Sequence, residues 1–140
     1  MLTPLLQAVP VVSPEQATGA FNLLWLLIAL PAAGALVLLV GGRRTDRWGH
    51  LLGTATVLGS FVIGLILFFT DLGRAGDHRA VHQHLWTFFE TGSYKVNFDI
   101  LFDQLSAVFV LLITGVGSLI HIYSIGYMEH DARRRRFFGY

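Results

Sequence analysis

The chain has 140 residues, of which 54% are hydrophobic and only 14% are charged, and its formal net charge is +1. A soluble domain usually carries about 25% charged residues, so this composition excludes an ordinary soluble globular protein. The absence of cysteine excludes disulfides, thiol catalysis and cysteine metal sites, and the small net charge gives no reason to expect a nucleic-acid partner.

The first segment, residues 1–20, is expected to form an irregular lead-in. It carries no Lys or Arg, and Pro4, Pro10 and Pro14 interrupt it. A secretory signal would begin with positive charge and continue into an unbroken apolar stretch, which this segment lacks. Cleavage after Ala20 is the alternative interpretation.

Three long stretches without formal charge follow, with apolar cores at 21–40, 51–69 and 104–124. A helix rises about 1.5 Å per residue, so each core of about 20 residues covers the roughly 30 Å hydrocarbon layer of a bilayer. The alternative, three buried helices of a soluble protein, lacks the polar residues needed for an outer surface. The pattern therefore predicts an all-α integral membrane fold with three transmembrane helices.

Positive charge is concentrated in two of the connections. Three arginines lie in the loop 41–50 and four consecutive arginines lie in the tail 125–140, whereas the loop 70–103 has three positive residues against five acids. Arginine-rich short loops stay in the cytoplasm. We expect the loop 41–50 and the tail to be cytoplasmic and the N-terminus and the loop 70–103 to lie outside. Binding of a regulatory partner or anionic lipid is the alternative use of the four arginines.

The outer loop 70–103 contains a strand pattern. The sequence YKVNFD from Tyr94 alternates apolar and polar residues, LWTFF precedes it, and ETGS between them supplies a turn in which Gly92 can adopt positive φ. This predicts a β-hairpin over residues 85–99 on the outer face. Two isolated strands are marginally stable, so the hairpin suggests a neighbouring partner surface.

The same loop contains the only metal-like spacing, in the sequence DHRAVHQH. Asp77, His78, His82 and His84 follow the H-x-x-x-H and H-x-H patterns of some metal sites. Without cysteine and within a loop, we interpret them as a solvated polar segment, and no metal site is predicted. Phosphate-binding loops, nucleophile elbows and nicotinamide-binding fingerprints are also absent from the sequence.

The first two apolar segments carry packing signals. Pro31 frees a backbone carbonyl that a neighbouring helix or water must satisfy, and we interpret it as part of an ordinary kinked packing helix rather than a gating hinge. Gly53, Thr56, Ser60 and Gly64 form a ridge of small residues in the second segment. Such a ridge lets another helix approach closely.

The third apolar segment carries a polar stripe. At 3.6 residues per turn, His121 lies on the same face as Asp103 about five turns later, with small and hydroxyl residues between them. The two ionisable groups would be about 27 Å apart, so they cannot touch each other. Asp103 and His121 are the candidate site residues, and that face must contact protein or water rather than lipid.

Two interpretations of the stripe remain open. It is either a packing seam, with Asp103 capping the helix N-terminus, or the border of a hydrated proton path in which His121 titrates. Neither supplies a titratable group at the membrane midplane.

The sequence from Asp103 onward resembles a known family. Its D-x-L-S start, the core TGVGSLIHIYSIGYM and the ending RFFGY are similar to the third-helix region of subunit L of bacterial NADH-quinone oxidoreductase, respiratory complex I. The mitochondrial counterpart is chain 5, and actinobacterial members are the most similar. The resemblance extends more weakly back to about Phe21 and includes the hairpin loop.

The resemblance implies a multi-pass, antiporter-like subunit of a proton-translocating enzyme in the bacterial plasma membrane. NADH, flavin, iron–sulfur clusters and quinone would belong to other subunits, and no cofactor is expected in this chain. The implied partners are the other membrane subunits of complex I and the lipid bilayer. The proton-path glutamate and lysines of the family lie on later helices, so only Asp103, His121 and the hairpin carry over.

The final FFGY is expected to open a fourth membrane helix, which would make this chain an N-terminal piece of a larger subunit. Two alternatives remain. One is a subunit of an Mrp-type cation/proton antiporter, and the other is a small three-helix membrane assembly protein.

Overall fold

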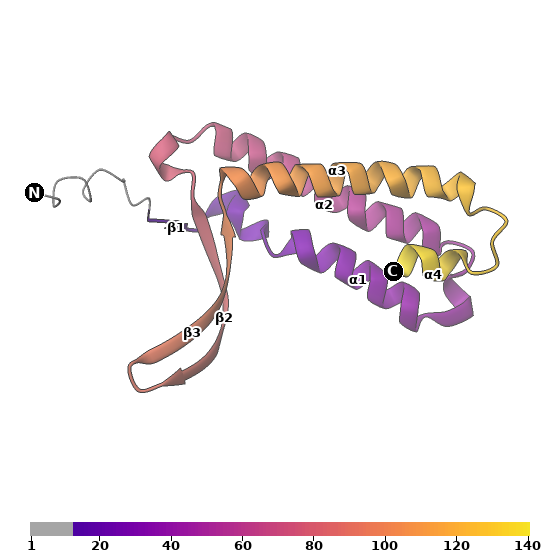
Figure 1. Ribbon diagram of the computed structural model, residues 1–140, viewed down its shortest axis with the longest axis horizontal. Coiled ribbons are helices and arrows are strands. Elements are labelled where there is room, and N and C mark those ends of the chain that lie inside the picture. The colour runs from indigo at the N-terminus through magenta and orange to yellow at the C-terminus, as the bar shows by residue number, and fades with distance from the viewer. Residues whose placement is uncertain (1–12) are drawn as a thin grey trace, which may run out of the picture.

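Three long helices lie side by side in the computed structural model, and a β-hairpin projects from one end of them (Figure 1). The structure describes residues 13–140, so residues 1–12 of the expected lead-in lie outside the described residues. The helices are α1 at Leu26–Val40, α2 at Gly49–Leu72 and α3 at Gln104–Tyr127. A 3-10 helix, η2 (Gly19–Leu23), precedes α1.

All three helices are long and apolar enough to cross a membrane, with the first candidate span running over Gly19–Val40. The predicted set of three membrane-type helices is therefore present. Both α2 and α3 continue past the predicted ends of their apolar cores, because helix formation does not stop where hydrophobicity falls. The loop between α1 and α2 contains a second 3-10 turn, η3 (Gly42–Thr45).

The small-residue ridge of α2 packs this helix against both of its neighbours. A Cβ added to Gly64 would lie 3.1 Å from Val110 of α3, and one added to Gly34 of α1 would lie 2.6 Å from the Thr56 hydroxyl of α2. At Gly34 the facing side chain would have to shift to admit a Cβ, and at Gly64 it would have to give slightly, so the helices approach closely at both positions. The ridge thus serves helix association, as its spacing predicts.

Pro31 lies inside α1 and has no N–H to bond to the carbonyl of Leu27, four residues earlier. The hydroxyl of Ser60 on α2 donates to that carbonyl over 3.2 Å, and Ser60 is fully buried. A neighbouring helix therefore satisfies the group that the proline frees, which is the packing interpretation of Pro31.

The hairpin consists of β2 (Val81–Thr91) and β3 (Tyr94–Phe102), which pair in antiparallel fashion. The prediction of a hairpin is confirmed, and the strands extend beyond the predicted range 85–99 in both directions. Gly92 has φ of 60° in the turn, as its position requires. Register shifts after His84 and after Thr87 mark bulges, which bend a hairpin.

A third strand joins the hairpin. Residues Glu15–Gln16 form β1, which pairs in parallel with the start of β2, so that Glu15 lies opposite Val81. The fold is mostly helical as expected, but the predicted hairpin is part of a three-stranded sheet, and two residues of the segment expected to be irregular form a strand. A strand of two residues is too short to show an alternating pattern, and its partner is distant in the sequence.

We call the region around β1, β2, β3 and the start of α3 the hairpin end. It holds a hydrophobic core made of the buried residues Phe21, Leu24, Leu67, Val81, Phe102 and Ala107. These residues come from η2, α2, α3 and the sheet, so the core fixes the hairpin to the helices. Elsewhere the outward faces of the helices expose large apolar side chains, as membrane helices do.

We call residues 41–48 and 128–140 the arginine end, which lies at the opposite end of the helices (Figure 1). A short helix, α4 (Arg134–Gly139), turns back there and packs against α1 and α2. Phe138 and Gly139 are buried in this contact. Helix α3 thus continues to Tyr127, past the start of the tail expected over 125–140, and a helix forms at the tail's arginines and FFG, where the sequence suggests the start of a further helix.

Candidate functional site

The polar stripe of α3 faces the other helices. Ser118 and Ser124 are buried and Thr114 and His121 are half-buried, whereas the opposite face of α3 is exposed at Leu105, Val108, Leu112, Val116 and Leu119. The hydroxyl of Thr114 donates to the Val110 carbonyl over 2.5 Å, and that of Ser118 donates to the Thr114 carbonyl over 2.6 Å. These two hydroxyl protons are therefore committed within the helix.

His121 lies at the arginine end of the stripe. Its Nδ1 is 2.8 Å from the carbonyl oxygen of Gly117, one turn earlier. A carbonyl only accepts hydrogen bonds, so Nδ1 carries the proton and the neutral ring keeps a lone pair at Nε2. The ring of Phe138 stands edge-on to it, with centroids 5.7 Å apart and an interplanar angle of 61°. The bond at Nδ1 thus anchors the ring to the preceding turn of α3.

A cavity of about 360 Å³ lies beside His121. Its walls come from four helices, with Pro31 of α1, Thr56 of α2, His121 of α3 and Phe138 of α4 among the lining residues. A water molecule occupies about 30 Å³ of liquid, so the cavity has room for several. Thr56, His121 and Tyr140 are the lining residues with polar side chains.

Two ionisable residues that the sequence analysis assigned to loops belong to α2. His50 lies in its first turn, and the Phe138 ring makes edge contacts with both His50 and His121, with its centroid 6.3 Å from that of His50. Asp71 is buried near the other end of α2. Within the described residues, His50 Nδ1 and Asp71 Oδ1 have no hydrogen-bond partner. Both flank the apolar core 51–69, and a prediction based on hydropathy places the ends of the helix short of these two residues.

Asp103 lies at the hairpin end and begins α3. Its carboxylate accepts a hydrogen bond from the backbone N–H of Ser106 over 2.8 Å, the arrangement of a helix N-cap. This bond holds the pKa of the Asp103 carboxyl below its ordinary value, because it stabilises the charged form. Asp103 is therefore a charged cap at neutral pH, which favours the structural interpretation for this residue. The structure does not bring it near His121.

The histidines with metal-like spacing point to different partners. His82 Nδ1 is 3.1 Å from the Pro14 carbonyl, and His84 Nδ1 is 2.6 Å from a carboxylate oxygen of Asp99 on the facing strand. The side chain of Asp77 lies outside what the structure describes, and among the described residues no group of three or more His, Cys, Asp or Glu side chains is placed to hold a metal ion. These contacts bind the sheet together instead.

Ionic contacts tie β1 to the segment after α2. Glu15 forms an ion pair with Arg74, and its other carboxylate oxygen is 2.5 Å from His78 Nδ1. The guanidinium of Arg79 donates to the carbonyls of Arg74 and Leu72 over 3.1 and 3.2 Å. The network fixes the end of α2 against the sheet and has the character of a structural clamp.

These features define a class of protein: a membrane-type helical bundle with a polar stripe, a cavity lined by a histidine at one end and a small sheet at the other. Residues 86–138 match the family model described as the N-terminus of chain 5 of NADH-ubiquinone oxidoreductase, complex I. The chain belongs to the family of NADH-quinone oxidoreductase subunit L and chain 5, whose N-terminal part it matches.

Individual relatives support this placement. The chain is 60% identical over 116 residues to NADH-quinone oxidoreductase subunit L of Mycobacterium tuberculosis. The aligned region covers 83% of this chain and 18% of the relative. It is 34% identical over 116 residues to chain 5 of Chondrus crispus, covering 82% of this chain and 17% of the relative. Subunit L of Rickettsia conorii is 32% identical over 120 residues. The chain thus spans less than a fifth of the length of these relatives.

Proposed function

We propose that this chain forms the N-terminal helices of an antiporter-like, proton-translocating membrane subunit of NADH-quinone oxidoreductase. NADH oxidation and quinone reduction take place on other subunits, which hold the flavin, the iron–sulfur clusters and the quinone. The observation that carries the proposal is the 60% identity to a subunit L over 83% of the chain. That similarity favours this function over an Mrp-type antiporter subunit and over an independent assembly protein.

Within this function, the cavity beside His121 serves as a hydrated pocket near the arginine end, through which protons reach the helices. The lone pair at Nε2 receives a proton relayed through the cavity water, which is itself replenished from the solvent on that side, while the bond from Nδ1 to Gly117 keeps the ring in place. The Phe138 ring packs against both His121 and His50. Asp103 has the separate task of starting α3.

The experiment uses the full-length subunit in the assembled complex. His121→Ala should lower the number of protons moved per NADH oxidised, while the amount of assembled complex stays close to wild type. His130→Ala is the matched control, because His130 is an exposed histidine in the segment between α3 and α4. Loss of assembly with a normal proton ratio in the surviving complex would instead assign His121 a packing role.

The proposed orientation places the hairpin end outside the bacterial plasma membrane and the arginine end in the cytoplasm. The arginine distribution supports it. The pairing of β1 with β2 requires the segment before α1 and the segment after α2 to lie on the same side, as two crossings between them demand.

These 140 residues contain no cysteine, so labelling at a single introduced cysteine is read against the parent protein without it. In intact cells, a membrane-impermeant maleimide should label Ser93→Cys in the hairpin turn and leave His130→Cys unlabelled. Both positions are exposed in the structure. Labelling in the reverse pattern would contradict the orientation.

The hairpin is the proposed contact with another membrane subunit of the complex. Trp86 and Phe98 stack with centroids 4.6 Å apart, yet about half of each side chain is exposed, at 52% and 49%. A neighbouring subunit would cover this aromatic face and stabilise the projecting strands.

A further inference from the structure

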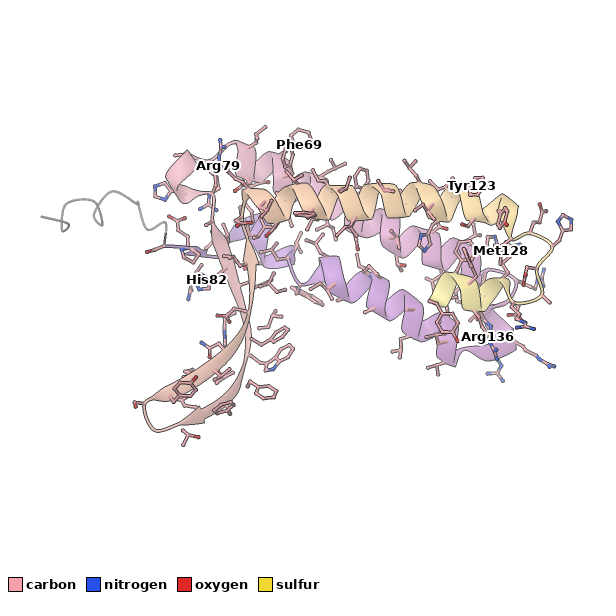
Figure 2. All side chains as sticks on the ribbon, in the orientation of Figure 1. Phe69, Arg79, His82, Tyr123, Met128 and Arg136 are labelled. Carbon is pink, nitrogen blue, oxygen red and sulfur yellow. The ribbon has the colours of Figure 1, made fainter. Side chains whose placement is uncertain are left out.

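A pocket at the arginine end lies between two segments that are distant in the sequence. It has a volume of about 250 Å³, and its lining residues are Arg43, Asp46, Ala132, Arg133, Arg135 and Arg136. Four arginines therefore face one aspartate. Figure 2 shows arginine side chains gathered at this end of the bundle around the labelled Arg136.

Arg135 builds the pocket. Its Nε is 2.9 Å from a carboxylate oxygen of Asp46, and its Nη1 donates to the Leu38 carbonyl near the end of α1 over 3.3 Å. Only 14% of the Arg135 side chain is exposed. This residue fixes α4 against α1 and uses the charge of Asp46.

The other three arginines have no such counter-charge. Within the described residues, the side chains of Arg43, Arg133 and Arg136 form no ion pair. All three residues line the same cavity, so positive charge is concentrated around it. Guanidinium groups bind phosphate oxygens through paired N–H donors, so the pocket has the chemistry of a phosphate site.

We propose that this pocket binds the phosphate headgroup of an anionic membrane phospholipid. Arg43 follows the last residue of α1, Val40, by one turn, and the other arginines follow the end of α3. The pocket therefore lies at the level where the hydrocarbon layer ends and the headgroups begin. This step rests on the proposed membrane placement but not on proton translocation.

The surroundings favour a lipid over a soluble phosphate compound. Exposed apolar side chains border the same end of the bundle: Val40 is 77% exposed and Phe137 is 46% exposed. An amphiphile with a phosphate head and hydrocarbon tails satisfies the arginines and covers these side chains together. A soluble phosphate satisfies only the arginines.

The test uses photoreactive phospholipids in the assembled complex, held in phosphatidylcholine nanodiscs. A photoreactive phosphatidylglycerol should label peptides from residues 37–48 and 133–140 more strongly than the phosphatidylcholine analogue does. Arg133→Gln with Arg136→Gln should reduce that preference at least several-fold. Arg44→Gln with Arg47→Gln is the matched control, because it removes the same charge from exposed positions that do not line the pocket.

Three results would overturn the proposal. The first is equal loss of labelling in both double variants, which would show a diffuse attraction to basic loops. The second is displacement of the label by excess inorganic phosphate, which would show a site for soluble anions. The third is no preference for the anionic probe. The amount of assembled complex shows that each variant folds, and because no proton flux is measured, failure of the proposed transport role leaves the result unaffected.

Discussion

Asp103 shows how one hydrogen bond decides between two roles for a carboxylate. The sequence allows a proton carrier or a helix cap at this position, and both require the same residue type. In the structure, the carboxylate accepts the backbone N–H of Ser106, which otherwise has no partner in the first turn of α3. The bond lowers the pKa of Asp103 and so keeps the group charged at neutral pH.

Asp103→Ala should destabilise the folded chain by about 1 kcal/mol, because it removes the cap. Asp103→Asn should retain most of that stability, since its side-chain oxygen accepts the same bond but without the charge. The measurement is reversible unfolding in mixed micelles.

Comparing the wild type with Asp103→Asn at different pH values tests the charge on this cap. The folded-state pKa of Asp103 is depressed, so its charge contributes stability at pH values above its unfolded pKa. That contribution is lost as pH falls through the lower, folded-state pKa. The advantage of the wild type over Asp103→Asn should therefore hold at neutral pH and vanish in strong acid. A constant difference across the whole range would contradict this assignment.

At the scale of the helices, Pro31 and Ser60 form a coupled pair. Ser60→Ala should destabilise the bundle by about 1 kcal/mol, because the Leu27 carbonyl loses its donor in an apolar interior. In a Pro31→Ala background the helix regains its own N–H to this carbonyl, and Ser60→Ala should then have a smaller effect. A double-mutant cycle in unfolding free energy measures the coupling. Additive effects would show that the Ser60 hydroxyl does not serve this carbonyl.

Much of the fold follows from the sequence at this scale, and the failures have physical causes. Three apolar runs of membrane length, the stripe of α3 and the hairpin turn at Gly92 are local periodic signals. Helix α4 and strand β1 depend on tertiary contact, because Phe138 finds its place only against Gly53 and β1 only against β2. The sequence does not place His50 in a helix, because a polar residue at the boundary of an apolar run makes the predicted helix too short.

For the whole molecule, the distribution of charge predicts that these residues alone do not conduct protons. The sequence contains no ionisable side chain between Leu51 and Thr70 or between Leu105 and Ile120. A lone proton is costly at the centre of a hydrocarbon layer about 30 Å thick. Liposomes containing the 140-residue chain and an internal pH-sensitive dye should therefore hold a pH gradient as well as empty liposomes do. Saturable proton flux that depends on His121 would contradict the prediction.

The parallel pairing of β1 with β2 has a consequence for biogenesis. Glu15 leaves the ribosome long before Val81, its strand partner, and both α1 and α2 are synthesised between them. In the proposed membrane orientation, β1 therefore stays on its side of the membrane without its partner, open to proteases, until α2 has crossed and β2 has followed. The sheet then closes late, after the first two crossings of that orientation are complete.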